Sequence, residues 1–173
     1  MKPRVIPSPR LLLVVTAAGT AAAVALLFGV NLELVSRAST WFAAALLLVA
    51  CGDVLLTRRA WRAAQVRMSR ALPSAFAIGV RQLVHLQFDS AGSRRLRCEV
   101  YDHCDPSLRI AGLPATVEIQ PNKRVDLAYE VIPTRRGEIE FAPADLRVRG
   151  VLGLCELLER AGESDARRSY PDF

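Results

Sequence analysis

Two long apolar segments open the chain. Residues 11–30 are twenty apolar or small residues without an ionisable group, and a helix of that length, rising about 1.5 Å per residue, crosses a hydrocarbon core of about 30 Å. A second apolar segment covers residues 39–56. A cleaved signal peptide is the alternative for the first segment, but its apolar part is longer than such peptides carry. The pattern therefore predicts two transmembrane helices, 11–30 and 39–56.

After about residue 69 apolar and polar residues alternate, which is the period of a half-buried strand. The pattern predicts strands at 83–89, 95–101, 116–119, 125–131, 138–141 and 146–149. Turn residues at 89–93 predict an antiparallel hairpin between the first two strands. Residues 154–160 fit a strand or a helical turn equally well. Six short strands separated by turns predict an all-β sandwich, immunoglobulin-like or fibronectin-like.

The predicted organisation is a two-helix transmembrane hairpin followed by the sandwich. Residues 1–10, with prolines at positions 3, 7 and 9, are expected to form a basic disordered arm. Residues 57–68 form a basic juxtamembrane segment that continues as a helix at headgroup level, and residues 69–173 form the β-sandwich domain.

The charges favour one orientation in the membrane. The chain carries a formal charge of +6, and its cations flank the two apolar segments. They are Lys2, Arg4 and Arg10 before the first segment and Arg58, Arg59, Arg62, Arg67 and Arg70 after the second. By the positive-inside rule both termini are cytoplasmic in a multi-pass protein of the inner (plasma) membrane. The same cations favour anionic lipid headgroups as a partner, and no nucleic acid is expected.

Five residues are candidate membrane anchors: Trp41, Asp53, Arg58, Arg59 and Trp61. The tryptophans suit the membrane interface. Asp53 lies within a turn of the basic end of the second segment, where we expect it to anchor the helix end beside Arg58 and Arg59. The alternative is that Asp53 belongs to an ion pathway.

The sequence offers little catalytic chemistry. His85 is expected on the solvent face of a strand, and His103 beside Cys104 is interpreted as a loop rather than a metal site, which would need four paired ligands. The four cysteines form no disulfide framework, which favours a reducing compartment. We therefore expect no enzyme activity, no cofactor and no metal.

A proline-arginine-glycine segment carries a family resemblance. The chain combines a basic arm, two helices with an aspartate before an arginine pair, and residues 132–137, Ile-Pro-Thr-Arg-Arg-Gly. A strand at 138–141, a stretch at 146–154 ending in Gly-Leu, and Tyr-Pro-Asp at 170–172 follow. In this order it resembles the bacterial membrane proteins of the domain of unknown function 58 (DUF 58) family.

The resemblance implies a role and leaves others open. Family members continue into a von Willebrand type A-like domain, so the chain looks like the N-terminal half. The family implies work with a MoxR-type AAA+ ATPase in assembling envelope complexes. Arg135 and Arg136 are then candidate partner-binding residues, although a structural turn with paired arginines is the simpler interpretation. The leading hypothesis is a non-catalytic protein-binding scaffold. The alternatives are a transport or channel component using Asp53, and part of a metal-dependent protein whose active domain lies elsewhere.

Overall fold

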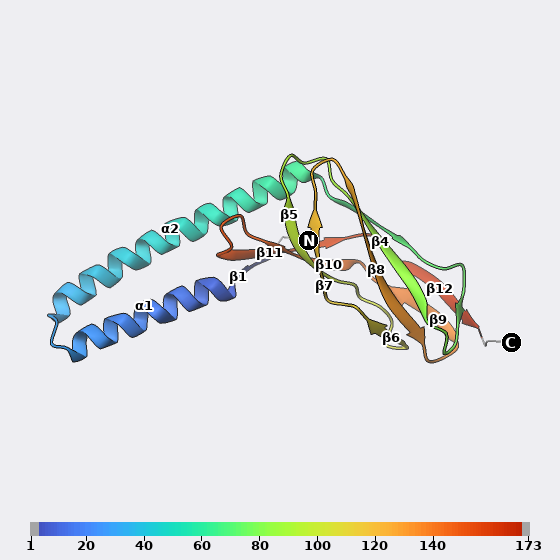
Figure 1. Ribbon diagram of the computed structural model, residues 1–173, viewed down its shortest axis with the longest axis horizontal. Coiled ribbons are helices and arrows are strands. Elements are labelled where there is room, and N and C mark those ends of the chain that lie inside the picture. The colour runs from blue at the N-terminus through green and yellow to red at the C-terminus, as the bar shows by residue number, and fades with distance from the viewer. Residues whose placement is uncertain (1–3, 171–173) are drawn as a thin grey trace. The chain divides into compact units, whose positions relative to one another are not determined.

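The computed structural model describes residues 4–170 (Figure 1). The chain divides into two compact units. The first contains the two long helices up to Arg59 together with Arg149–Leu157, and the second contains Ala60–Val148 and the chain from Leu158 onward. Lys2 and Pro3 of the predicted arm, and Pro171 and Asp172 of the Tyr-Pro-Asp segment, lie outside the described residues.

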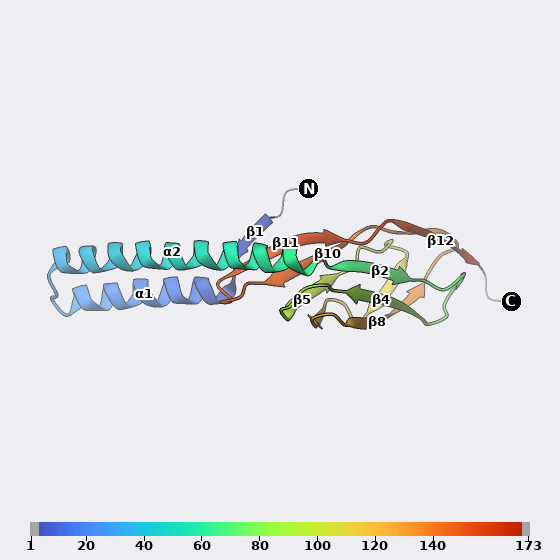
Figure 2. The same ribbon diagram turned by 90° about the horizontal axis from the view of Figure 1, so that it is seen from above.

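Two apolar helices, α1 (Pro9–Leu27) and α2 (Leu32–Ala64), dominate the first unit. They run side by side, as Figures 1 and 2 both show. Ser8 caps α1 by accepting a hydrogen bond from the N–H of Leu11, and Pro9 occupies the first helical position, where no N–H is needed. Both helices are long and apolar enough to cross a membrane, and no residue of α1 is buried.

The helix bounds differ from those expected. α2 includes residues predicted as a loop, the predicted span 39–56 and most of the juxtamembrane segment, which is helical up to Ala64. The description of a disordered arm is wrong for residues 4–10, since Arg4–Pro7 form strand β1 and α1 begins at Pro9. Prolines at a sheet edge and at a helix start are compatible with order.

The second unit is a β-sandwich whose strands lie in three sheets. One sheet has the order β2 (Arg67–Ala71), β4 (Gln82–Asp89), β8 (Arg124–Pro133), β6 (Leu108–Ala111). In another, β5 (Leu96–Tyr101) pairs with β10 (Ala144–Arg149) and β7 (Ala115–Ile119). β11 (Cys155–Ala161) follows β10 in the chain and runs from the first unit into the second. In the third, β12 (Asp165–Tyr170) lies between β3 (Phe76–Ala77) and β9 (Gly137–Phe141).

Alternating side chains of these strands fill the core. The predicted inward residues of β4 and β5 are buried, namely Val84, Leu86, Phe88, Leu96, Cys98 and Val100. Tyr129 and Val131 of β8 join them, and His85 is exposed as expected. The predicted β-sandwich is thereby confirmed, because alternation with one buried face is what two packed sheets require.

The predicted hairpin between the first two strands is wrong. β4 pairs with β2 and β8, whereas β5 pairs with β7 and β10, so the connection passes from one sheet to the other. It is bound to the end of α2: Ala91 N–H and Ser90 Oγ both donate to the carbonyl of Ala64. A Cβ on Gly92 would lie 2.6 Å from Ala64 Cα, so only glycine fits this approach.

Several strands were not expected from the pattern. The segment 154–160, left open between strand and helical turn, is strand β11. The sequence did not indicate β1, β2, β3, β6 or β12. β12 is rich in charge, with Arg168 in register with Glu138 of β9, so it lacks the apolar alternation by which the other strands were predicted.

Candidate functional site

The two candidate partner-binding arginines lie on the connection between β8 and β9. This arginine turn, residues 133–137, is where the sequence predicted a turn. β8 and β9 belong to different sheets, so the turn passes across an end of the sandwich. Gly137 has φ of 140°, a conformation that side chains rarely adopt, which explains the glycine.

Hydrogen bonds fix the arginine turn on its N-terminal side. The N–H of Thr134 donates to the carbonyl of Ser107 over 2.8 Å, and its hydroxyl donates to the same oxygen over 2.6 Å. The carbonyl of Pro133 accepts from the N–H of Gly79 at 2.9 Å. A turn held this way presents its side chains with little backbone freedom to lose on binding.

Arg135 and Arg136 are exposed on this fixed turn. Neither forms an ion pair with a carboxylate within residues 4–170, so the interpretation that both arginines are paired is not supported. Hydrogen bonds from Ser107, aided by the charge of Arg135, lower the pKa of Asp105. The turn therefore presents two guanidinium groups whose donors no described carboxylate binds, beside one aspartate whose lowered pKa keeps it ionised at neutral pH.

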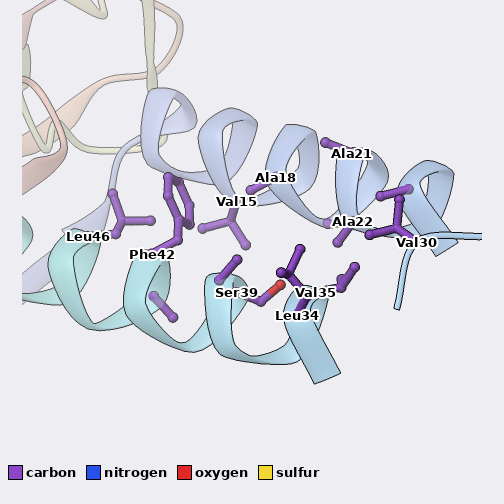
Figure 3. A pocket seen from close by; sticks show the side chains of 14 residues that line it. Val15, Ala18, Ala21, Ala22, Val30, Leu34, Val35, Ser39, Phe42 and Leu46 are labelled. Carbon is purple, nitrogen blue, oxygen red and sulfur yellow. The ribbon is translucent and has the colours of Figure 1, made fainter. Parts of the chain in front are cut away.

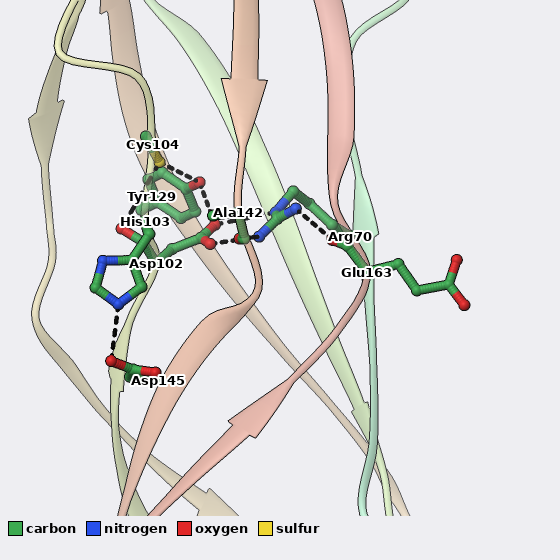
Figure 4. Close-up of polar contacts among 8 residues, drawn as sticks. All are labelled: Arg70, Asp102, His103, Cys104, Tyr129, Ala142, Asp145 and Glu163. Carbon is green, nitrogen blue, oxygen red and sulfur yellow. Dashed lines mark hydrogen bonds and ion pairs between the residues drawn. The ribbon is translucent and has the colours of Figure 1, made fainter. Parts of the chain in front are cut away.

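A buried polar network lies within the same unit (Figure 4). Arg70 of β2 donates from Nε and Nη2 to the carboxylate of Asp102, and their side chains are 2% and 0% exposed. Arg70 also donates to the carbonyls of Ala142 and Glu163, and Tyr129 Oη donates to Asp102 at 2.6 Å. One arginine thus joins β2 to three connections that are distant in sequence.

A cavity of about 480 Å³ lies against the segment that follows Asp102. Its lining includes His103, Cys104, Asp105, Glu140 and Asp165. Burial raises the pKa of Cys104 to about 11, so the group is a thiol rather than a reactive thiolate at neutral pH. Cys104 contacts the hydroxyl of Tyr129 at 3.4 Å, whereas His103 bonds to Asp145 at 2.9 Å. The described contacts therefore do not assemble a cysteine-histidine pair.

Metal-ligand geometry is equally lacking within residues 4–170: no group of three or more His, Cys, Asp or Glu side chains is arranged to hold an ion. Cys98, on the neighbouring strand β5, faces the sandwich core and is 0% exposed. Burial raises its pKa to about 12.

Asp53 forms the main polar centre of the first unit. Its carboxylate is 0% exposed and accepts three backbone hydrogen bonds from the loop between β10 and β11. The donors are the N–H groups of Leu152 (2.7 Å), Leu154 (2.9 Å) and Cys155 (3.1 Å). The sequence places Asp53 near Arg58 and Arg59, but within residues 4–170 it forms no ion pair with either. Converging N–H groups satisfy the carboxylate instead.

Residues of both helices hold the same loop. Thr57 Oγ1 donates to the carbonyl of Asp53 and accepts from Val151 N–H at 3.1 Å. At the start of α1, Ser8 Oγ donates to the carbonyl of Gly153 at 2.7 Å, and Ser8 N–H donates to that of Leu154 at 2.9 Å. A Cβ on Gly150 would lie 2.4 Å from Asp53 Oδ2. The start of α1, residues 53–57 of α2 and the loop therefore form one hydrogen-bonded assembly.

The remaining candidate anchors lie on α2. Trp41 is 77% exposed near the start of the helix, and Trp61 is half-buried near its end. Arg58 is half-buried and Arg59 is exposed. An apolar groove of about 530 Å³ lies between α1 and α2, and Figure 3 shows its lining side chains. Its α1 side is lined mostly by small residues, including Ala18, Gly19 and Ala22.

Sequence reasoning missed the residues that these assemblies depend on. Arg70 counts in the sequence only as one of the juxtamembrane cations, and no pattern singles out Asp102 or Tyr129. The same holds for Ser8 and Thr57. The sequence does carry one usable signal, a serine followed by proline at a helix start, which is typical of an N-cap.

Comparisons with known proteins give a fold likeness only. No family model matches the chain, and no curated protein does. A portion of Escherichia coli alpha-2-macroglobulin that spans domain MG7 to the C-terminus aligns with 63% of this chain at 18% identity and a TM-score of 0.49. A CARDB domain from Pyrococcus furiosus aligns with 63% at 11% identity (TM-score 0.42), and a human PapD-like domain with 64% at 10% (TM-score 0.43).

The covered shares of those chains differ widely. The match spans 17% of the macroglobulin portion and 7% of the longer native macroglobulin chain, against 96% of the CARDB domain and 89% of the PapD-like domain. Scores of this size support no conclusion about activity or partners.

Proposed function

We propose that the chain is a membrane-anchored, non-catalytic module that binds a protein partner at the cytoplasmic face. The observation that carries this proposal is the arginine turn, which presents Arg135 and Arg136 exposed and without a described carboxylate partner on a backbone fixed by Ser107. Arginine forks bind carboxylates with two parallel hydrogen bonds, and arginine is enriched where protein surfaces meet.

Membrane insertion is supported by the length and exposure of the helices. Along α2, Trp41 and Arg58 are seventeen positions apart, about 26 Å of helix, which fits a hydrocarbon core flanked by interfacial groups. Large apolar side chains between them, such as Leu47 at 65% and Leu48 at 74%, are exposed. An apolar surface of this extent needs lipid or protein to cover it.

The distribution of cations supports a cytoplasmic sandwich. Arg58, Arg59 and Arg62 follow the apolar part of α2, while the opposite end carries an i,i+4 pair of Arg37 with Glu33 at 2.7 Å and so no excess charge. Both termini then face the cytoplasm, as the positive-inside rule predicts. The immunoglobulin-like or fibronectin-like type of the sandwich stays a prediction.

The geometry of Asp53 favours anchoring over transport. Both carboxylate oxygens accept backbone hydrogen bonds, and the side chain has no exposed surface. An ion-pathway carboxylate needs contact with water or with the passing ion. Asp53, on which the transport hypothesis was based, therefore fits a structural role.

The resemblance to the DUF 58 family adds a partner to the proposal, a MoxR-type AAA+ ATPase. The arginine turn is the segment on which that resemblance mainly rests, Pro133 to Gly137. An acidic surface on the ATPase would complement Arg135 and Arg136.

The experiment is co-purification of the detergent-solubilised full chain with a MoxR-type ATPase from the same cells, with and without nucleotide. We expect wild type to retain the ATPase and R135Q/R136Q to lose most of it. The matched control is R94Q/R95Q, a second adjacent pair of exposed arginines. If all three proteins retain the ATPase equally, the arginine turn does not bind it. If wild type retains none, this ATPase is not the partner.

A further inference from the structure

Two arginines converge beside the loop that Asp53 holds. Arg10 lies in the first turn of α1, and Arg149 is the last residue of β10. A Cβ placed on Gly153 would lie 3.2 Å from Nη1 of Arg10 and 3.6 Å from Nε of Arg149. The two guanidinium groups therefore approach the same point in space, from elements far apart in the sequence.

The absence of a side chain on Gly153 permits this close approach. Its φ is +75°, which disfavours any side chain, and a side chain would also meet the Arg10 guanidinium. The backbone around it is fixed, because Gly153 N–H donates to the carbonyl of Gly150 and its own carbonyl accepts from Ser8 Oγ. The close approach of both arginine side chains to Gly153 is thus a fixed feature of the loop.

The convergence brings like charges together without a described counter-charge. Neither Arg10 nor Arg149 forms an ion pair with a carboxylate in the part of the chain from Arg4 to Tyr170. Asp53, which binds the same loop, directs its oxygens at backbone N–H groups instead. Two cations held close together repel each other unless an anion lies between them. The geometry therefore leaves both guanidinium groups available to one external anion.

We propose that Arg10 and Arg149 form a binding site for the phosphate of an anionic phospholipid headgroup. Guanidinium groups bind phosphate through paired hydrogen bonds, which suits two arginines that face one point. The depth is also right, because the apolar run of α1 begins at Leu11, directly after Arg10. A phosphate at Arg10 would place its acyl chains alongside α1. The inference rests on the proposed membrane insertion.

The test is native mass spectrometry of the full chain in neutral detergent, titrated with phosphatidylglycerol or phosphatidylcholine. We expect wild type to prefer phosphatidylglycerol, and R10Q/R149Q to lose affinity for it by about fivefold per arginine. The matched control, R109Q, removes an exposed arginine of β6 that is neither a candidate membrane anchor nor one of the cations flanking the apolar segments. It should bind as wild type does.

Two results would overturn the site. One is equal affinity of wild type and R10Q/R149Q for phosphatidylglycerol. The other is displacement of bound phosphatidylglycerol by inorganic phosphate at equal concentration, which would identify a soluble phosphate as the ligand. Arg10 is exposed, so R10Q alone provides the measurement if the double variant does not fold.

Carbonate extraction of membranes separates this inference from the proposed function. Wild-type chain released by carbonate would contradict membrane anchoring itself. Chain that resists carbonate but binds phosphatidylglycerol no better than R10Q/R149Q would contradict the headgroup site alone.

Discussion

Replacing Arg70 with methionine removes the cation from an ion pair whose side chains are 2% and 0% exposed. Asp102 would stay buried with only the hydroxyl of Tyr129 donating to it. The carbonyls of Ala142 and Glu163 would also lose the hydrogen bonds that Arg70 donates. Methionine keeps most of the length and the apolar contacts of the arginine stem, so the change isolates the charge and its hydrogen bonds.

The expected loss in the free energy of unfolding is about 3–5 kcal/mol, the usual cost of leaving one partner of a buried pair uncompensated. That is a large part of the roughly 5–15 kcal/mol that holds an ordinary domain together. The double variant R70M/D102L should recover much of the loss, since apolar groups of similar volume often replace a buried pair without cost.

Urea titration of the full chain in detergent micelles, read by pulse proteolysis of the sandwich, measures these differences. The control is R81M, which breaks the pair of Arg81 with Glu130, whose side chains are 68% and 38% exposed. We expect that control to cost less than about 1 kcal/mol. If R70M lowers the urea midpoint no more than R81M does, the buried pair of Arg70 with Asp102 does not stabilise the sandwich.

Three further predictions concern separate parts of the chain. Gly150→Ala should destabilise the loop and expose it to protease in micelles, because the added Cβ would meet the Asp53 carboxylate at 2.4 Å; unchanged proteolysis would contradict this. Partial burial alone would raise the pKa of Asp145. The hydrogen bonds that His103 and Arg160 donate to it outweigh this effect, so its pKa is lowered. Its contribution to stability is therefore complete above the ordinary aspartate range and lost as pH falls below it, and D145N should show weaker acid destabilisation in urea titrations from neutral pH to below about pH 4. Cys98, with a pKa raised to about 12 by burial, should resist iodoacetamide at neutral pH until urea unfolds the sandwich; rapid modification of the native chain would refute its burial.

Local pattern specified the elements better than their partners. The alternation at Val84, Leu86 and Phe88 identifies the buried face of β4 because side chains of a strand alternate regardless of which strand lies beside it. The same alternation carries no information on pairing, so it predicts a hairpin of β4 and β5 although each belongs to a different sheet. The connection from β4 to β5 is held by a hydrogen bond from the N–H of Ala91 to the carbonyl of Ala64 in α2, and a local pattern cannot predict a bond between two elements.

The candidate site was predictable to the same extent. Pro133 and Gly137 mark the arginine turn by their own backbone preferences, whereas the support from Ser107 comes from a distant connection. Asp53 is recognisably unusual in an apolar helix, but its partners lie about a hundred positions further along the chain. Arg70 and Asp102 are ordinary charged residues in the sequence, and only the packed sandwich buries them.

The central claim, a membrane hairpin with a cytoplasmic sandwich, is tested most directly by thiol labelling on intact cells. Single cysteines would replace Asn31, between the two helices, and Ser164, exposed on the sandwich, after the four native cysteines are changed to alanine. A membrane-impermeant reagent should label the cysteine at position 31 and leave that at 164 unlabelled until the cells are opened. Labelling at 164 on intact cells, or at neither position after opening, would contradict the account.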